Sequence, residues 1–169
     1  MEEKMSDVYV ECLIKTESST LAKLLRILLI MLTVVFGVLA LMGVIVALVV
    51  AVVAGIGAYF AHLNTNIEYE YLYLDKELSV DKIMAQTKRK RVATYEVERM
   101  EIFAPIKSYH LDNYKNRTGK ETDYSIRREE QPDRRYLMYY DGSQKVILSP
   151  NEELVKALRN VAPRKVFTD

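Results

Sequence analysis

One uninterrupted hydrophobic stretch dominates the pattern of polar and apolar positions along the chain. Residues 27–63 contain no Asp, Glu, Lys or Arg. A surface helix of a soluble protein keeps one polar face, so this stretch predicts membrane-embedded structure. The apolar run from residue 24 to residue 63 would be about 60 Å long as one helix, whereas one bilayer span needs roughly 20 residues. We therefore predict two spans, residues 24–41 and 44–63. A single long span and a soluble buried hairpin are the alternatives.

The turn and the flanking charges predict how this hairpin is oriented. Met42-Gly43 is the best turn, because glycine permits the unusual backbone that a tight turn needs. Basic residues flank both spans, including Lys23 and the run at 88–91, whereas the turn carries no charge. Positive flanks remain in the cytoplasm, so we expect a two-span protein of the cell membrane with both termini cytoplasmic. Tyr59 and Phe60 are suited to the aromatic belt at the interface. The apolar run is too long for a signal peptide.

Alternating and β-branched residues after the spans predict a series of strands. They cover residues 67–74, 78–84, 89–97 and 100–104, with a turn at 75–77 and with Pro105 ending the last strand. An earlier strand, residues 8–14, has no neighbour before the hairpin. Because the hairpin returns the chain to its starting side, we expect this strand to pair with the later domain.

The rest of the chain predicts a loop, a β-hairpin and a helix. Residues 107–133 are polar and irregular, with a short helical turn near their start. Residues 135–140 and 145–148 form a hairpin around Asp141-Gly142. The terminal helix is expected to begin with Ser149 as N-cap, Pro150 in the first position and Glu152 completing a capping box, and to stop at Pro163. Its apolar face consists of Leu154, Val155, Leu158, Val161 and Ala162.

The predicted fold class is therefore α+β, with three segments. Residues 1–20 contain the first strand, residues 21–63 form the transmembrane helical hairpin, and residues 64–169 form a cytoplasmic, antiparallel β-rich domain closed by a C-terminal helix. That helix must bury its apolar stripe against a sheet or the open end of a barrel.

Composition excludes several function classes. The 169 residues carry a net charge of +1, so a nucleic-acid-binding role has no electrostatic basis. The single cysteine, Cys12, cannot form an intramolecular disulfide, and we expect it to pack in or beside a sheet. His62 and His110 are the only histidines, and no ligand spacing accompanies them. Nucleotide-binding, protease and esterase motifs are absent, and the spans hold no acidic or basic side chain. We predict no catalytic, cofactor or metal site and no enzyme activity.

The sharpest functional pattern is a basic run after the second span, which consists of Lys88, Arg89, Lys90 and Arg91. Basic residues near the inner leaflet gain about 1 kcal/mol each from anionic lipid. The run is therefore a candidate lipid- or partner-binding site; alternatively, it is a solvated strand and turn that only sets topology. Tyr69, Tyr71 and Tyr73 share one face by period two and are interpreted as core, with ligand stacking as the alternative.

Two resemblances extend this interpretation. The segments YLYLDKELSVDKI and RVATYEVERMEIF, followed by a hairpin and a terminal helix, resemble the bacterial pleckstrin-homology-like (PH-like) domains. The segments DVYVECLIK, LNTNIEYEYLY and PNEELVKALRNVAPRKVF resemble a family of small bacterial two-span membrane proteins with a domain of unknown function. The second resemblance covers nearly the whole chain. Together they imply a PH-like cytoplasmic domain but no mechanism.

These observations favour a membrane-anchored, non-enzymatic adaptor or tether that binds a protein partner or anionic lipid at the inner leaflet. The first alternative is an accessory subunit that stabilises a larger membrane complex through the spans. The second is a membrane-tethered enzyme whose site is assembled from scattered loop residues. The pattern does not set the oligomeric state.

Overall fold

The computed structural model describes residues 9–127 and 132–168, and these fall into two compact units. The β-rich unit contains the described residues up to Thr16, Glu68–Ile83 and the described residues from Arg89 onward. The helical unit contains Glu17–Ile67 and Met84–Lys88. Each unit is therefore assembled from segments that lie far apart in the sequence.

The helical unit is a hairpin of two apolar helices, α1 (Thr20–Leu41) and α2 (Ile45–Thr65). Ser19 caps α1, because its Oγ accepts a hydrogen bond from the Ala22 amide at 3.2 Å. The chain reverses at Met42-Gly43, where Gly43 has a φ of +93°, so the predicted turn is correct. At 22 and 21 residues, both helices are long and apolar enough to cross a membrane.

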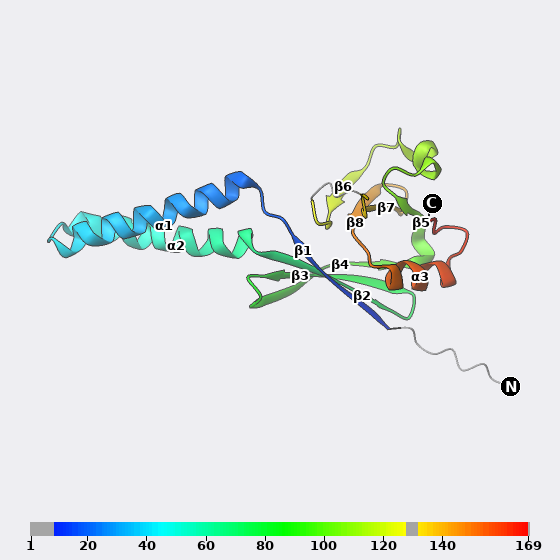
Figure 1. Cartoon of the computed structure of the whole chain (residues 1–169), viewed down its shortest axis with the longest axis horizontal. Coiled ribbons are helices and arrows are strands. Elements are labelled where there is room, and N and C mark those ends of the chain that lie inside the picture. The colour runs from blue at the N-terminus through cyan, green and yellow to red at the C-terminus, as the bar shows by residue number, and fades with distance from the viewer. Residues whose placement is uncertain (1–8, 128–131, 169) are drawn as a thin grey trace. The chain divides into compact units, whose positions relative to one another are not determined.

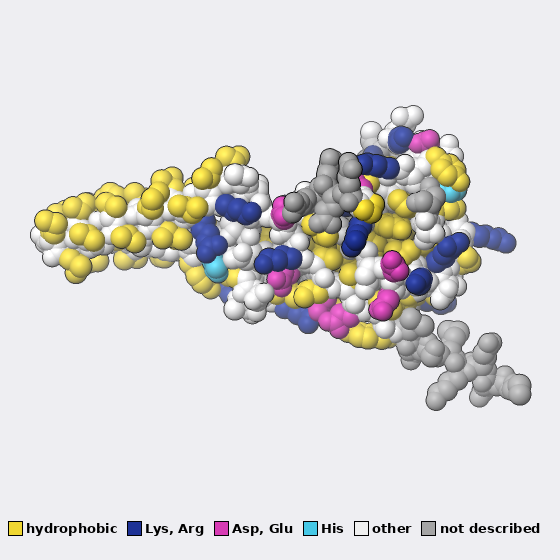
Figure 2. Space-filling view, in the orientation of Figure 1, with side chains coloured by type: hydrophobic (Ala, Val, Ile, Leu, Met, Phe, Trp, Pro, Cys, Tyr) yellow, Lys and Arg dark blue, Asp and Glu magenta, His cyan; other side chains and the backbone are white. Residues whose placement is uncertain are grey.

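The two helices contact each other through small side chains. Ala47, Ala51 and Ala54 are the buried apolar residues in the first half of α2, and they recur at helical spacing. Small residues allow two backbones to approach closely where both helices are apolar. Most large side chains of the hairpin are exposed, and Figure 2 shows hydrophobic side chains along its visible surface.

The first sheet of the β-rich unit has four strands in the order β1-β2-β3-β4 (Figure 1). Their bounds are Val10–Thr16, Ile67–Leu74, Glu77–Met84 and Lys88–Glu96. Strands β1 and β2 are neighbours although the whole helical hairpin separates them in the chain. The turn between β2 and β3 consists of Asp75 and Lys76, both with positive φ, which matches the twist of a two-residue hairpin.

The second sheet has the order β5-β7-β8-β6, formed by Met100–Pro105, Tyr136–Tyr140, Gln144–Leu148 and Lys120–Asp123. The predicted hairpin is present, with β7 and β8 antiparallel around Asp141-Gly142. Strand β5 ends at Pro105 as predicted, and Pro105 itself pairs with Tyr136 as the last residue of the strand. A short 3-10 helix, η2 (Tyr109–Tyr114), occupies the start of the stretch predicted to be irregular.

Strand β6 corrects the prediction that residues 107–133 form only a loop. It pairs in parallel with β8, from Lys120 opposite Gln144 to Asp123 opposite Ile147. Gly119 permits this approach, because a Cβ there would collide with the Ser143 carbonyl. No alternation of apolar residues marks β6, so its pairing depends on a strand more than 20 positions away. The predicted loop residues 128–131 lie outside the described part of the chain.

Aromatic and aliphatic side chains fill the space between the two sheets. Tyr69, Tyr71 and Tyr73 are all buried, so the interpretation of this stripe as core is correct. The Tyr71 hydroxyl donates to the Tyr124 carbonyl at 2.8 Å and accepts from the Ser149 amide at 3.1 Å. This one side chain therefore connects β2 to the segments that follow β6 and β8.

The terminal helix α3 (Glu152–Val161) begins later than predicted. Asn151 is the N-cap, and its side chain accepts from the Leu154 amide at 2.9 Å; the predictions of Ser149 as cap and of a capping box with Glu152 are therefore wrong. Ser149 is instead held at the end of β8, where its Oγ accepts from the Ile126 amide at 3.3 Å. The helix ends just before Pro163, as predicted.

The buried face of α3 differs slightly from the prediction. It contains Leu154, Val155, Ala157 and Leu158, whereas Val161 is 44% exposed. After α3 the chain crosses to β5, where the Phe103 amide donates to the Lys165 carbonyl and the Phe167 amide donates to the Phe103 carbonyl. The C-terminal segment therefore covers the free edge of β5.

Candidate membrane-surface and partner-binding site

The basic run at 88–91 lies at the start of β4 and does not act as one uniform patch. Arg89 forms ion pairs with Glu70 and Asp81, and Arg91 pairs with Asp81 at 3.0 Å. Both carboxylates are about 95% buried, so burial would be costly without these guanidinium partners. The two arginines therefore neutralise buried carboxylates of the first sheet, although more than half of each side chain is exposed.

The two lysines of the run have different surroundings. The Lys88 ammonium lies over the Tyr59 ring of α2, 5.9 Å from its centroid, which is within cation–π range. Lys90 is exposed, and no acidic partner lies within 4.0 Å of it among the described residues. The turn before β4 is tied to the end of α2, because the Ala85 amide donates to the Asn66 carbonyl at 2.7 Å. This part of the helical unit thus places the first basic residue beside the predicted aromatic belt.

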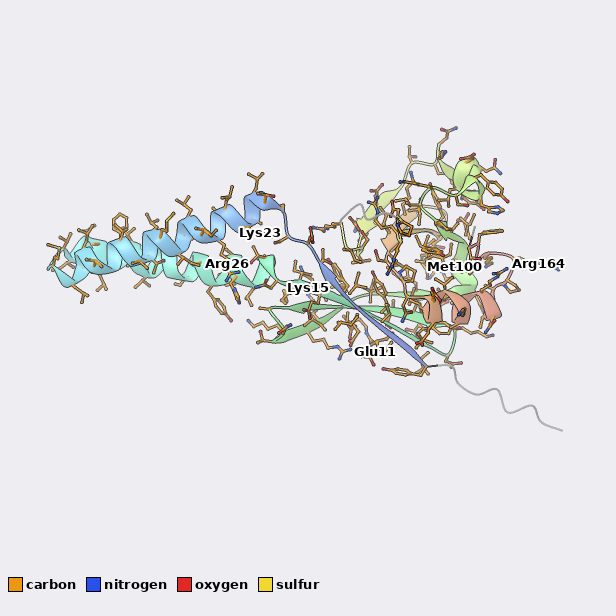
Figure 3. The ribbon with its side chains drawn as sticks, in the orientation of Figure 1. Glu11, Lys15, Lys23, Arg26, Met100 and Arg164 are labelled. Atoms are coloured by element: carbon orange, nitrogen blue, oxygen red, sulfur yellow. The ribbon has the colours of Figure 1, made fainter. Side chains whose placement is uncertain are left out.

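Basic residues also occur at the start of α1. Figure 3 shows Lys23 and Arg26 projecting from the first turns of that helix, and Glu11 and Lys15 projecting from β1. Acidic and basic side chains are therefore confined to the first turns of α1 and are absent from the remainder of the hairpin up to His62.

A polar cleft of about 360 Å³ lies within the β-rich unit, between β4 and the second sheet. Residues 92–95 of β4 form one wall. The other side is lined by side chains of β6 and of the β7–β8 turn, which include Lys120, Thr122, Tyr124, Tyr140, Asp141 and Gln144. Strands β4 and β6 are both end strands of their sheets, so the cleft is bounded by two sheet edges.

The floor of the cleft is a cluster of tyrosine rings. The rings of Tyr95 and Tyr140 meet edge to face at 5.0 Å. Tyr124 also lines the cleft, and its ring meets that of Tyr69, which lies outside the lining, edge to face at 5.2 Å. Burial raises the pKa of Tyr95 far above its ordinary value, and the neighbouring phenol of Tyr124 raises it further. The Tyr95 phenol is therefore a neutral hydrogen-bonding group at physiological pH.

Two cations and one carboxylate set the charge of the cleft. Arg99 pairs with Asp141 at 2.5 Å, and its guanidinium lies 5.4 Å from the centre of the Tyr140 ring. Lys120 is exposed, and no carboxylate lies within 4.0 Å of its ammonium in the described residues. The cleft therefore keeps one uncompensated positive charge.

The cysteine and the histidines occupy structural positions. Cys12 is buried on the inner face of β1 with Val10 and Ile14, and burial raises the pKa of its thiol, which disfavours the reactive thiolate. His110 stacks on Phe167 with ring centres 3.8 Å apart, and the His62 ring nitrogen lies 3.4 Å from the Asn66 amide nitrogen. Within residues 9–127 and 132–168, no three Cys, His, Asp or Glu side chains form a group able to hold a metal ion.

Sequence reasoning identified the basic run but missed the cleft. Lys120 and Thr122 lie in the stretch interpreted as a loop, and Arg99 follows β4 in an ordinary charged segment. Gly119 was the one indication of this strand in the sequence. A glycine in a strand permits another backbone to approach closely, and Gly119 directly precedes Lys120 and Thr122.

Comparison with known proteins yields one result. The family described as bacterial PH-like domain (DUF6106) matches residues 6–168, which is nearly the whole chain. No curated protein and no solved structure matched.

Proposed function

Because the chain belongs to the bacterial PH-like domain family (DUF6106), we propose that it is a non-enzymatic adaptor that holds a PH-like domain at the inner face of the cell membrane. Two helices long enough to span a membrane precede most of the domain, and β1 precedes them. Because β1 and β2 are neighbours in one sheet, both ends of the helical hairpin connect to the same domain, which supports placing both ends on one side of the membrane. In this proposal both termini are cytoplasmic, as the basic flanks favour.

The observation that carries the proposal is the position of Lys88 over Tyr59. Tyr59 lies near the end of the apolar part of α2, where aromatic side chains are enriched at the membrane interface. A lysine at this level is within reach of lipid phosphates, and Lys90 follows it on the exposed strand. We propose that these two lysines contact anionic headgroups, while Arg89 and Arg91 neutralise the buried carboxylates.

Anionic lipid binding should depend on these two lysines. We expect Lys88→Ser/Lys90→Ser to weaken binding of phosphatidylglycerol to the full chain by up to about thirty-fold, since each basic residue contributes about 1 kcal/mol. Native mass spectrometry of the full chain in mild detergent measures this, with phosphatidylcholine titrated in parallel. Both arginines are kept, so that Glu70 and Asp81 retain their partners.

The matched control is Lys107→Ser/Lys156→Ser, which removes the same charge from two lysines whose side chains are about three-quarters exposed. This control should bind phosphatidylglycerol as the unchanged chain does. Equal phosphatidylglycerol binding by all three proteins would reject the lipid contact. A stoichiometric membrane protein that co-purifies with every variant would instead favour the accessory-subunit alternative.

A further inference from the structure

The two sheet edges that border the polar cleft are open. The C-terminal segment covers the edge of β5 through a bridge between Val166 and Phe103, whereas β4 has a paired strand only on its β3 side and β6 only on its β8 side in the described chain. An edge strand presents unpaired backbone N–H and C=O groups, which form a template for another strand. Proteins commonly recognise extended peptides at such edges.

The backbone direction of β4 supports this use. The Glu96 amide donates to the Tyr140 hydroxyl at 3.4 Å and so points away from β3 toward the second sheet. Backbone groups alternate in direction along a strand, so the Thr94 amide points the same way. Thr94 is exposed and lines the cleft, where its amide can pair with an incoming strand.

The charges around the cleft indicate which kind of peptide segment would bind there. Residues 92–95, by which β4 lines the cleft, carry no charged side chain. On the opposite wall, the Lys120 ammonium has no acidic partner among the described residues. Hydroxyl groups of Thr122 and the floor tyrosines supply further donors. An extended segment with an acidic side chain matches both the open backbone and the uncompensated charge of Lys120.

We infer that an extended acidic segment of a partner protein binds in this cleft as an added strand along residues 92–95 of β4, with one carboxylate paired to Lys120. The inference rests on the proposed adaptor function and assigns it a protein-binding site. This site is distinct from the Lys88 and Lys90 lipid contact. Side chains of the segment that point inward meet Tyr95 and Tyr140, and those that point outward remain in solvent.

A selection from a random dodecapeptide library tests the inference. The target is the full chain in nanodiscs of phosphatidylcholine alone, which removes competition from anionic lipid. We expect enrichment of peptides rich in Asp and Glu. Lys120→Glu should weaken their binding about ten-fold or more, because a charge-assisted contact becomes a repulsion. Lys156→Glu, which makes the same charge change on α3, should leave their affinity unchanged.

Hydrogen exchange distinguishes strand addition from simple charge attraction. Bound peptide should slow exchange of the Thr94 amide, and Thr94→Pro, which removes that amide, should weaken binding while the unfolding midpoint is monitored separately. Failure to enrich acidic peptides, unchanged affinity in Lys120→Glu, or unchanged exchange across residues 92–95 would each overturn the inference.

The lipid variant separates this inference from the proposed lipid contact. If Lys88→Ser/Lys90→Ser abolishes peptide binding as completely as Lys120→Glu does, the peptide binds the basic run and the cleft is not its site. If phosphatidylglycerol binding is normal and no acidic peptide is enriched, only the cleft inference fails. If acidic peptides bind as described and phosphatidylglycerol binding proves independent of the lysines, the cleft inference stands and the lipid contact fails.

Discussion

A chain carrying both Val49→Arg and Val53→Arg is expected to stay out of the membrane. Both valines are more than 60% exposed on the same face of α2, one helical turn apart. An arginine near the centre of a span opposes insertion by about 3 kcal/mol. Val53 lies near the centre of α2 and Val49 one turn nearer its start, so the pair opposes insertion by up to about 6 kcal/mol. The eight Leu, Ile, Val and Phe residues that remain in α2 supply only about 4 kcal/mol in favour. The free energy of inserting α2 should therefore change from favourable to unfavourable.

The measurement is the fraction of the chain that stays in membranes after an alkaline carbonate wash. Val49→Leu/Val53→Leu, which changes the same positions without adding charge, should remain membrane-embedded. If the double arginine variant resists the wash as well as this control does, α2 does not cross the bilayer. Release of the Val49→Leu/Val53→Leu control by the wash would instead favour the soluble buried hairpin that the apolar pattern alone leaves open.

Replacing Tyr71 with phenylalanine should destabilise the β-rich unit by about 3 kcal/mol. The side chain is fully buried, and its hydroxyl bonds both the Tyr124 carbonyl and the Ser149 amide. Without the hydroxyl, these two backbone groups lose their partner, and a buried polar group without a hydrogen bond costs about 1–3 kcal/mol. Burial also raises the pKa of Tyr71, so the hydroxyl remains protonated and the expected loss does not vary across neutral pH.

Denaturant unfolding of the full chain in detergent, followed by circular dichroism of the sheet signal, measures this loss. Tyr109→Phe is the matched control, because Tyr109 is 67% exposed, and its replacement should change stability by less than about 0.5 kcal/mol. Equal unfolding midpoints for Tyr71→Phe and Tyr109→Phe would show that the Tyr71 hydroxyl does not connect the two sheets.

Local patterns predicted much of this architecture. The apolar run and Met42-Gly43 gave the helical hairpin and its turn, because both depend on neighbouring residues alone. The strands of the first sheet lie within about two residues of their predicted bounds. The predicted start of β1, Val8, lies outside the described residues. Alternation also placed the tyrosine stripe in the core.

The features that were missed depend on contacts between distant residues. Ser149 is a good N-cap by type, but the Tyr71 hydroxyl and the Ile126 amide hold it at the end of β8, so Asn151 caps the helix instead. Strand β6 exists only through its pairing with β8.

The same limit applies to the candidate sites. The partners of Arg89 and Arg91 lie on β2 and β3, and only the strand order brings Glu70 and Asp81 to them. The sequence therefore indicated a basic run without showing which of its members are neutralised. The polar cleft was missed because one of its walls is β6, a strand that no alternation of apolar residues marks.

The central claim is that the two helices enter the membrane and return, leaving β1 and β2 on one side to share a sheet. Separate epitope tags at Met1 and Asp169, probed with protease in sealed inverted and right-side-out vesicles, test it most directly. We predict that both tags are cleaved in inverted vesicles and that both are protected in right-side-out vesicles. Cleavage of one tag in each preparation would put the termini on opposite sides and contradict the account.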